Sequence, residues 1–425
     1  MIRTLEKNKI RDLRVMIPVG GQAIRLKPLT DEVSKAYIRF LNRPLIERGL
    51  VELAKQGVKH FIFGVKGYIN YKNLHDYFDD GISLSAKYGI TPRIHIKYQP
   101  HDEDIGSADS LRIILNYYDI TDPILVMQGD NLFDLDLKDM FRTHLQKKTF
   151  LTLALTHVKN VEDYGIISLD KKMFVEKFVE KPKLKDAPTN LANTGIYLFD
   201  PKVREILNSE KTKKMMEKIG RLDFGKDFIP YLVEKNYMVY GYILPGDWYD
   251  LGTPANYLTA MGHILQSGVK GINTYHISGK NYNIWIEGKS KDSMKKRNTI
   301  IQNIKNGKIN FDGSILIGRH CQIGEGTFIR NSSIDNFTVI GDNVVIDNSA
   351  ILDRSIIHNY SKIKNSIIGR HVIVNSSYSK PTSISRISVI GDDTIIGEGC
   401  ELHSTKIGSH QTIPPERRMV DELAD

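Results

Sequence analysis

The stretch IGRHCQIGEGTFI, residues 317–329, places one isoleucine at every sixth position, at Ile317, Ile323 and Ile329. The same spacing recurs further along the chain, at 340, 346 and 352, at 357 and 363, and at 390, 396 and 402. A period of six fits neither a helix nor a hairpin. It is typical of hexapeptide repeats, in which one aliphatic residue per flat side of a parallel β-helix points to the axis. We therefore predict a left-handed parallel β-helix in this region.

The alternative for this region is a β-sandwich, whose alternating strands would show a period of two. A sandwich would not explain the repeated Ile-Gly pairs, which begin at 317, 323, 340, 368, 390, 396 and 407. The segment NSSYSKPTSISR, residues 375–386, breaks the repeat with serines and a proline. It is predicted to be an excursion between coils.

Upstream of the repeats, short apolar runs alternate with helical patterns, as in an α/β sheet with crossover helices. The predicted strands are VMIPV from 15, HFIFGV from 60, RIHIKY from 93, ILVM from 124 and FLTLALTHV from 150. Between the first two, RPLIERGLVELAKQGV has apolar residues at helix spacing and ends at Gly57. The predicted organisation is an N-terminal extension (1–14), an α/β domain (15–265), a linker (266–290), the β-helix (291–412) and a polar tail (413–425).

Composition narrows the class of protein. The 425 residues are 41% hydrophobic and 26% charged, and no window approaches the roughly 18 uninterrupted apolar residues of a membrane span. The N-terminus lacks the apolar core of a secretion signal, and Cys321 and Cys400 are too few for a disulfide framework or a thiolate zinc site. A cytoplasmic location without a membrane partner is expected. The net charge of +9 is dispersed, so we expect anionic small substrates rather than nucleic acid.

A glycine pair, Gly20 and Gly21, follows the first predicted strand, with the cations Arg25 and Lys35 behind it. Paired glycines let backbone amides approach an anion closely, and nearby cations neutralise phosphate charge. The pattern is neither the Walker loop nor the dinucleotide fingerprint. A tight structural turn with surface cations is the alternative.

Two aspartates are candidate metal ligands. Asp130 ends an apolar strand, and in an open α/β sheet ligands bind beyond the carboxyl ends of strands. Asp250 stands before a Leu-Gly-Thr-Pro turn and would be only a turn residue unless a second ligand is needed. Mg²⁺ is usually held by one or two carboxylates together with substrate phosphates, which these two would satisfy. Asp134 and Asp136 are assigned to capping of the next helix.

A third group suits a sugar phosphate. Glu180 and Lys181 stand together before a proline, so the carboxylate could accept bonds from sugar hydroxyls while the ammonium meets a phosphate. Gly165 and Asn193 lie at predicted strand starts suited to contacts with a polyol. A solvated surface loop is the alternative for the Glu-Lys pair.

In this order the segments resemble the sugar-1-phosphate nucleotidyltransferases, or nucleotide-sugar pyrophosphorylases. The matching blocks are GGQAIRLKPLT, SKAYIRFLNRPLIE, GSADSL, QGDN, DYGII, EKP, NTGIY and WYDLGTP. The resemblance spans about Val15 to Leu265, and many members carry a hexapeptide β-helix afterwards. It implies an α/β fold with a Rossmann-like mixed sheet.

The resemblance also implies roles for matching residues. The nucleotide phosphates would be bound by Gly20, Gly21 and Arg25, with Lys35 on the phosphates during transfer. Mg²⁺ would be held by Asp130 and Asp250. The sugar would contact Gly165, Glu180 and Asn193, its phosphate Lys181, and the base Gln99 with Gly106 nearby.

Three departures from the family pattern stand out. Ile24 occupies the position of a common threonine, which removes a hydroxyl near the phosphate loop, YIRF replaces an LLPV-like stretch, and GSADSL replaces a GTAxAL-like block. Because Arg25, Lys35, Asp130 and Asp250 are intact, an active enzyme is predicted.

The implied reaction transfers a nucleotidyl group from a nucleoside triphosphate to a sugar 1-phosphate and releases pyrophosphate. The Gln99 amide can pair with uracil or thymine, but also with adenine. The predicted substrates are glucose 1-phosphate with UTP or dTTP. The alternatives are formation of ADP-glucose or GDP-mannose, a bifunctional enzyme with an acetyltransferase β-helix, and a non-catalytic nucleotide-sensing scaffold subunit.

The β-helix is predicted to serve assembly or regulation. Its aliphatic end coils and flat faces favour association, so a homo-oligomer is expected. Some related chains use a histidine of this domain for acetyl transfer, and His320, His358, His371 and His403 fall in the repeat region here.

Overall fold

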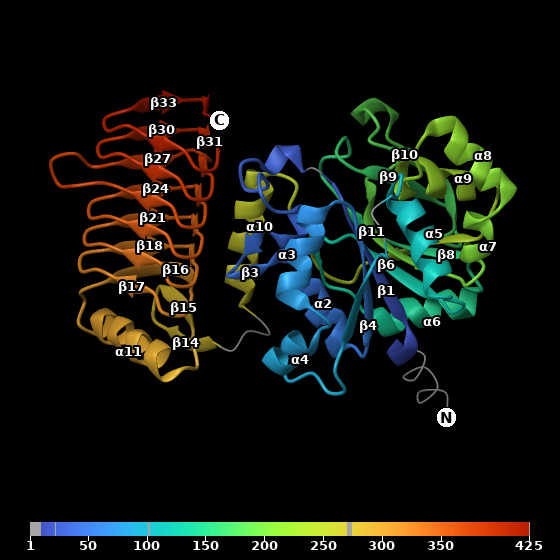
Figure 1. The fold of residues 1–425 in the computed structure, drawn as a ribbon, viewed down its shortest axis with the longest axis horizontal. Coiled ribbons are helices and arrows are strands. Elements are labelled where there is room, and N and C mark those ends of the chain that lie inside the picture. The colour runs from blue at the N-terminus through green and yellow to red at the C-terminus, as the bar shows by residue number, and fades with distance from the viewer. Residues whose placement is uncertain (1–9, 22, 101–102, 270–273, 425) are drawn as a thin grey trace. The chain divides into compact units, whose positions relative to one another are not determined.

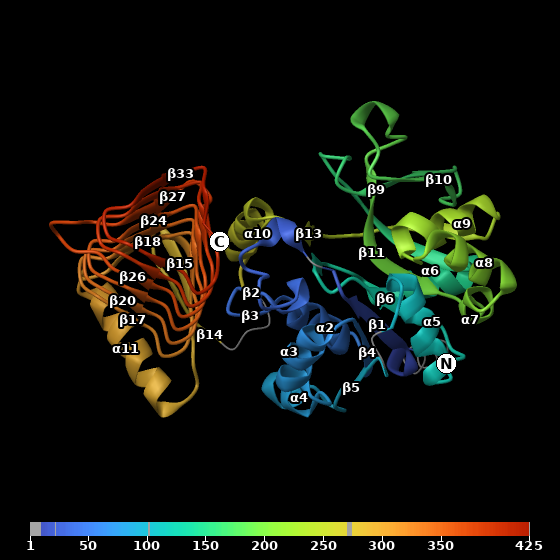
Figure 2. The same ribbon diagram turned by 45° about the horizontal axis from the view of Figure 1, so that its top comes forward.

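The apolar run before the glycine pair forms strand β1 (Arg14–Val19) of a mixed sheet in the computed structural model. The structure describes residues 10–21, 23–100, 103–269 and 274–424. Of the predicted N-terminal extension, residues 1–9 lie outside the described residues. The chain divides into two units, an α/β unit and a β-helix unit, which Figure 1 and Figure 2 show with their elements labelled.

The α/β unit contains the chain up to Gly21, Ser34–Tyr37 and Leu45–Asp250. Its sheet has the strand order β10-β9-β11-β6-β1-β4-β5, with β8 paired to β11 and β12. The strands β4 and β6 run parallel to β1, β5 runs parallel to β4, and β11 is antiparallel to β6. The bounds are β4 (His60–Val65), β5 (His95–Tyr98), β6 (Ile124–Met127), β8 (Leu151–His157), β9 (Gly165–Leu169), β10 (Val175–Glu180), β11 (Leu191–Phe199) and β12 (Val239–Ile243). The predicted mixed sheet is confirmed.

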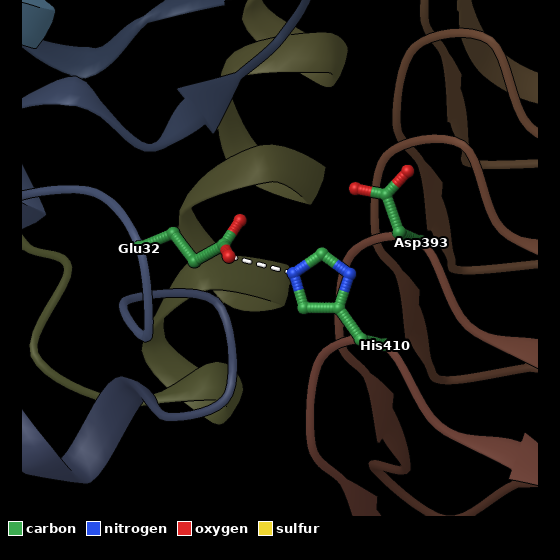
Figure 3. Close-up of side chains that lie close together, drawn as sticks. All are labelled: Glu32, Asp393 and His410. Carbon is green, nitrogen blue, oxygen red and sulfur yellow. Dashed lines mark hydrogen bonds and ion pairs between the residues drawn. The ribbon is translucent and has the colours of Figure 1, made fainter.

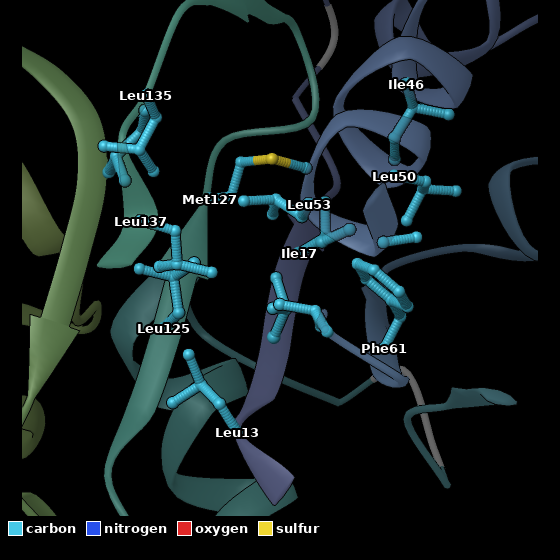
Figure 4. Close-up of a cluster of buried hydrophobic side chains, with 14 of the residues drawn as sticks. Leu13, Ile17, Ile46, Leu50, Leu53, Phe61, Leu125, Met127, Leu135 and Leu137 are labelled. Carbon is cyan, nitrogen blue, oxygen red and sulfur yellow. The ribbon is translucent and has the colours of Figure 1, made fainter. Parts of the chain in front are cut away.

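Helices pack on this sheet. They are α2 (Leu45–Lys55), α3 (Tyr68–Phe78), α4 (Ile82–Tyr88), α5 (Ser107–Tyr117), α6 (Leu137–Lys147), α7 (Val203–Leu207), α8 (Glu210–Ile219) and α9 (Ile229–Glu234). The helix predicted between the first two strands is α2, whose apolar residues at helix spacing are buried. Figure 4 shows Ile46, Leu50 and Leu53 of this helix beside Ile17 of β1 and Met127 of β6. Burial of these side chains fixes the strand ends that carry the polar residues described below.

The β-helix unit contains the segment that ends at Val33, Ile38–Pro44 and the chain from Leu251 onward. Helix α10 (Pro254–Ser267) begins with Thr253 as a cap, whose side chain accepts from the Asn256 amide, and has proline at its first position. Helix α11 (Lys291–Lys305) begins after a Ser290 cap. None of the described helices combines the length and the apolar character that a membrane span requires.

The repeats form a parallel β-helix, as predicted. Strands in successive coils pair in parallel, for example Ile340 with Ile357 and Ile346 with Ile363. The strands are β14 (Thr274–Ser278), β15 (Tyr282–Glu287), β16 (Asn310–Ile317), β17 (Gln322–Ile323), β18 (Phe328–Arg330), β19 (Ser333–Ile334), β20 (Val339–Ile340), β21 (Val345–Asp347), β22 (Ala350–Ile351), β23 (Ile356–Ile357), β24 (Lys362–Lys364), β25 (Ile367–Ile368), β26 (Ile373–Val374), β27 (Ser383–Ser385), β28 (Val389–Ile390), β29 (Ile395–Ile396), β30 (Glu401–His403), β31 (Lys406–Ile407), β32 (Thr412–Ile413), β33 (Arg418–Val420) and β34 (Leu423–Ala424).

The predicted period of six is wrong on one of the three sides of each coil. The core residue there is Ile351, not Leu352, because the third side is one residue shorter than the other two. Buried serines fill the corners: the amide of Ser349 donates to Oγ of Ser332 at 3.0 Å, and that of Ser366 donates to Oγ of Ser349 at 3.1 Å. These hydroxyls satisfy backbone amides that the strand ladders leave unpaired.

Three predicted segments look different in the structure. The predicted excursion, 375–386, includes β27, and only residues 375–382 form a loop between β26 and β27. This loop lengthens one coil, so that Ile363 pairs with Ile384 and Ile367 pairs with Val389. The predicted linker, 266–290, contains β14 and β15, and β15 pairs with β16. The predicted polar tail, 413–425, continues the β-helix through β33 and β34, because its charged residues point outward while Met419 is buried among the axial residues.

Candidate active site

Lys35, Asp130 and Asp250 meet at one point, although they are far apart in the sequence. Lys35 begins a 3-10 helix, Lys35–Tyr37, and Asp130 lies in the turn between β6 and β7 (Asn131–Phe133). Strand β13 (Trp248–Asp250) pairs antiparallel with β7 and sets Asp250 opposite Asn131. This pairing brings the two aspartates together.

The ammonium of Lys35 lies between the two carboxylates. It donates to Oδ2 of Asp130 at 2.6 Å and to Oδ1 of Asp250 at 2.8 Å. Burial disfavours the charged form of Lys35, but attraction to Asp130 and Asp250 outweighs it, so the pKa of Lys35 is raised above its ordinary value of 10.5. Lys35 is therefore a fixed cation at neutral pH.

A polar cavity of about 310 Å³ opens beside this group. The predicted site residues that line it are Asp130, Gly165, Glu180, Lys181, Asn193 and Asp250. The structure thus brings together the predicted metal ligands and the predicted sugar-phosphate residues. A cavity of this size, with convergent polar groups, is suited to a small polar ligand.

Glu180 ends β10 and faces the cavity in a partly buried position. Burial raises the pKa of its carboxyl group above the ordinary value, against the attraction of Lys181 and Lys226. The Cβ that Gly165 lacks would lie 2.8 Å from Oε2 of Glu180, so the glycine leaves the carboxylate its space. Lys181 has a left-handed backbone conformation, with φ of 46°.

Asn193 is held by its neighbours on β11. Its side-chain amide donates to the hydroxyl of Tyr197 at 2.9 Å, and its oxygen accepts from the amide of Gly195 at 3.2 Å. Tyr197 is buried, and burial raises the pKa of its phenol. Asn193 therefore presents a fixed amide at the cavity wall.

The glycine pair follows β1 and is exposed. A Cβ on Gly20 would lie 3.0 Å from Cβ of Lys66, whereas a Cβ on Gly21 would have no described heavy atom within 4 Å apart from its chain neighbours. Arg25 and Ile24 lie on the 3-10 helix Ile24–Leu26, which belongs to the β-helix unit. Ile24 is 65% exposed, so no core packing accounts for this departure from the family pattern.

Gln99 and Gly106 lie outside the residues that line this cavity. Gln99 is buried after β5, where its oxygen accepts from the Ser110 hydroxyl and its amide donates to Asp104 at 3.3 Å. Gly106 precedes α5, and a Cβ there would lie 2.6 Å from the carbonyl oxygen of Leu222. Their predicted base-binding roles stay predictions.

Sequence reasoning missed three charged residues of the cavity, Asp163, Asp223 and Lys226. Asp223 and Lys226 surround the start of a π-helix, Phe224–Phe228, and a Cβ on Gly225 would lie 3.1 Å from Oε2 of Glu180. π-helical turns are frequent at functional sites. The only sequence signal was the glycine in LDFGKDF, flanked by opposite charges.

Asp130 and Asp250 fit a divalent cation by their chemistry. Their oxygens converge on one cationic nitrogen, so both carboxylates already face a single positive charge. Both also line the cavity, where phosphate oxygens of a substrate would complete the coordination that Mg²⁺ prefers.

The capping role predicted for Asp136 is confirmed, because its side chain accepts from the Asp139 amide at the start of α6. Asp134 is not the cap residue of this helix.

The four histidines considered for acetyl transfer have separate local surroundings. His320 stacks on Phe337 with ring centroids 4.8 Å apart, and Nδ1 of His371 lies 3.2 Å from Asp393. Nδ1 of His403 lies 2.7 Å from the Ser385 hydroxyl, and His358 is exposed. Each has a local partner or faces solvent.

A nucleotidyl transferase family model matches residues 14–267, which is more than half of the chain. The chain belongs to the nucleotidyl transferase family. A model for the GMPPB C-terminal domain matches residues 311–420. The protein is thus an enzyme of the sugar-1-phosphate nucleotidyltransferase class, as the resemblance implied.

The relatives of this nucleotidyltransferase include enzymes that are named for different substrates. It is 27% identical over 423 residues to a mannose-1-phosphate guanyltransferase of Pichia angusta, covering 94% of this chain and 97% of that one. It is 25% identical over 415 residues to the mannose-1-phosphate guanyltransferase beta-A of Xenopus laevis, covering 96% and 100%. It is 27% identical over 349 residues to a UTP–glucose-1-phosphate uridylyltransferase of Synechocystis, covering 77% and 84%.

The fold is also similar to a solved structure, a putative glucose-1-phosphate thymidylyltransferase from Bacillus anthracis. The match has a TM-score of 0.50 and 22% identity, and covers 58% of this chain and 93% of that one. At this identity the likeness concerns the fold of the nucleotidyltransferase.

Proposed function

We propose that this nucleotidyltransferase forms GDP-mannose and pyrophosphate from GTP and mannose 1-phosphate. The proposal is supported by relatives that match nearly the whole chain, including its β-helix, and that are named mannose-1-phosphate guanyltransferases. The initial prediction, UTP or dTTP with glucose 1-phosphate, becomes the second candidate. It is supported by the uridylyltransferase relative, whose match covers less of the chain.

The main observation that supports a catalytic role for this site is the contact of Lys35 with Asp130 and Asp250. An oxygen of the sugar phosphate attacks the α-phosphorus of the nucleoside triphosphate, and the bond from that phosphorus to the pyrophosphate oxygen breaks. The nucleophile is already an anion, so the protein must supply position and positive charge rather than a base. Lys35 supplies a fixed positive charge beside the cavity.

Asp130 and Asp250 would hold Mg²⁺, which when bound neutralises charge on the phosphates. Lys35 would then pass from the carboxylates to the phosphates, since its two partners, Asp130 and Asp250, both line the cavity. The glycine pair would let its backbone amides approach the nucleotide phosphates. Arg25 keeps the phosphate role that the resemblance predicts.

The sugar phosphate would bind in the cavity. Glu180 would accept bonds from sugar hydroxyls, Asn193 would offer its fixed amide, and Gly165 would leave space beside Glu180. Lys181 would meet the sugar phosphate, with Lys226 as a second cation on the same wall. Together these groups match an anionic polyol.

The test is a substrate panel read by pyrophosphate release. GTP, UTP, dTTP and ATP are each paired with mannose 1-phosphate and glucose 1-phosphate, with Mg²⁺ and with EDTA. We expect the highest kcat/KM for GTP with mannose 1-phosphate, and loss of turnover in EDTA. A higher kcat/KM for UTP or dTTP with glucose 1-phosphate would transfer the proposal to the second candidate.

Lys35→Met separates catalysis from binding. We expect turnover to fall by about 100-fold to 1000-fold, as for removal of one transition-state contact, while nucleotide still binds. Lys138→Met, an exposed lysine at the start of α6, is the control and should keep wild-type turnover. Tight nucleotide binding without turnover of any pair in the wild type would favour the scaffold alternative. Acetylation of glucosamine 1-phosphate from acetyl-CoA would favour the bifunctional one.

A further inference from the structure

The chain passes between the two units on both sides of Lys35. Ser34–Tyr37 belongs to the α/β unit, whereas the segment that ends at Val33 and the segment Ile38–Pro44 belong to the β-helix unit. Lys35 therefore contacts Asp130 and Asp250 within the α/β unit, while the segments on either side of Ser34–Tyr37 belong to the β-helix unit. A contact that fixes either of these flanking segments therefore restricts where Lys35 can lie.

The segment after Lys35 is bound to the β-helix by an ion-pair cluster around Arg39. The guanidinium of Arg39 makes a two-pronged contact with Asp335, in which Nη2 lies 2.7 Å from Oδ1. Nε also lies 3.3 Å from Oδ1 of Asp353. The side chains are only 16% exposed for Arg39, 1% for Asp335 and 7% for Asp353. Two parallel hydrogen bonds fix the orientation of the guanidinium relative to the carboxylate. Because the pair is buried, dissolved salt weakens it little.

The backbone at Arg39 is fixed as well. The hydroxyl of Tyr257, on α10, donates to the carbonyl oxygen of Arg39 at 2.7 Å. The ring of Phe40 packs edge-on against Tyr257 with centroids 5.0 Å apart, and Nη2 of Arg39 donates to the carbonyl oxygen of Asn42 at 2.6 Å. The segment is thus held by side chain and main chain together. Arg39 is the third residue of YIRF, the stretch that departs from the family pattern.

A second contact with the β-helix is made by the segment that precedes Lys35. Oε1 of Glu32 accepts from Nε2 of His410 at 2.6 Å, and Figure 3 shows this pair with Asp393 nearby. The three side chains are exposed, so this ion pair is weaker than the Arg39 cluster. It lies three residues before Lys35, while Arg39 lies four residues after it.

We propose that Asp335 and Asp353 of the β-helix are positioning residues for Lys35, acting through Arg39. The β-helix then serves catalysis by fixing the segment that carries the cation of the active site, in addition to any role in assembly. This inference rests on the proposed function of Lys35. Neither aspartate touches the reacting groups, so their effect is on the placement of Lys35 alone.

The test compares Asp335→Asn with a matched control, Asp347→Asn. Asp347 also makes a two-pronged contact with an arginine of the β-helix, Arg330, at 2.6 and 2.8 Å, but that pair does not involve the segments beside Lys35. In Asp335→Asn we expect kcat to fall by about tenfold to 100-fold with a smaller change in KM, as for displacement of a group by about 1 Å. In Asp347→Asn kcat should stay within twofold of wild type.

A second variant and a second measurement make the test independent of how well Asp335→Asn folds. Arg39→Lys keeps the charge but loses the two-pronged contact, and should lower kcat less than Arg39→Met does. Hydrogen exchange followed by mass spectrometry should show faster exchange in the peptide that contains Lys35 in both Asp335→Asn and Arg39→Lys. Wild-type kcat and unchanged exchange in these two variants would overturn the inference.

Lys35→Met distinguishes failure of this inference from failure of the proposed function. If Lys35→Met retains turnover, the catalytic role of Lys35 is wrong, and the exchange measurement alone decides whether the β-helix fixes the segment. If Lys35→Met is inactive while Asp335→Asn and Arg39→Lys are fully active, only the positioning inference is wrong.

Discussion

Lys35 donates a 2.6 Å hydrogen bond to Asp130, which lies in the turn after β6, at the edge of the cavity. The two residues are 95 positions apart in the sequence. The pair is therefore not required by any local turn. In the proposed function this pair would contact the substrate phosphates and a metal ion, so substitution of Asp130 is the most direct test of the site.

Asp130→Asn should lower turnover by about 100-fold to 1000-fold, because the amide is a poor ligand for a divalent cation. The unfolding free energy should change by no more than about 1 kcal/mol, because the side chain is partly exposed and Lys35 keeps Asp250 as a partner. Pyrophosphate release and urea unfolding measure the two effects. Asp134→Asn, at an exposed carboxylate four residues later, should leave turnover unchanged. Wild-type turnover in Asp130→Asn would remove Asp130 from the metal site.

Gly21→Ala tests whether a ligand, rather than the fold, requires the glycine pair. A methyl group on Gly21 would meet open space, so the melting temperature should change by less than about 2 °C. If backbone amides approach the nucleotide phosphates there, the KM for the nucleoside triphosphate should rise at least about tenfold. Gly262→Ala, within α10 and equally open, should leave KM unchanged and add about 0.5 to 1 kcal/mol of stability. An unchanged KM in Gly21→Ala would reduce the pair to a structural turn.

Gly165→Ala should weaken binding of the sugar phosphate through Glu180. The new methyl carbon would lie 2.6 Å from Cζ of Phe178 and 2.8 Å from Oε2 of Glu180, so one of these groups must move. We expect the KM for the sugar 1-phosphate to rise about tenfold while the KM for the nucleotide stays the same. Glu180→Gln, measured alongside, should raise the same KM. An effect confined to the nucleotide KM would place the sugar elsewhere.

The stability of the α/β unit should fall in mild acid because of His144. This residue of α6 is 3% exposed, with Nδ1 2.8 Å from the Thr149 hydroxyl, and burial lowers its pKa to about 4. A histidine that is buried neutral stabilises the fold fully above its unfolded pKa of about 6.5. That contribution is lost as pH falls from about 6.5 through 4, by up to about 3 kcal/mol.

Urea unfolding between pH 7.5 and 4.5 measures this loss. His144→Leu should flatten the slope, because the variant has no group to protonate at this position. His157→Leu, at an exposed histidine of β8, should keep the wild-type slope. An equal slope in wild type and His144→Leu would assign the acid sensitivity to other groups.

Much of the fold could be predicted because buried side chains recur in the sequence at spacings typical of each kind of secondary structure. The strand at Val15 and the helix at Leu45 were predicted from apolar spacing, and the β-helix from its period of six. The period failed at Ile351 because the length of each coil depends on how its corners close. Leu352 is also aliphatic, so composition could not show which of the two residues points to the axis.

The site was predictable only in part. Asp130 follows directly from the rule that ligands bind beyond strand ends, but Asp250 depended on the resemblance, because the β7–β13 pairing is not visible in the sequence. Asp223 and Lys226 were missed because alternating charges near a helix are typical of a solvated surface. The sequence marked YIRF as unusual, yet the partner of Arg39 lies 296 residues away, and only the folded chain reveals it.

The stacked coils also constrain how this chain can change in length. Each strand pairs with the equivalent strand of the next coil, so adding one residue within a strand would rotate every following axial side chain out of place. Adding a whole coil would preserve all pairings. The loop at 375–382, between β26 and β27, shows the other tolerated route, a loop at a corner. The β-helix can therefore grow by whole coils or by corner loops, and evolution or an engineer can lengthen it only in those two ways without breaking its core.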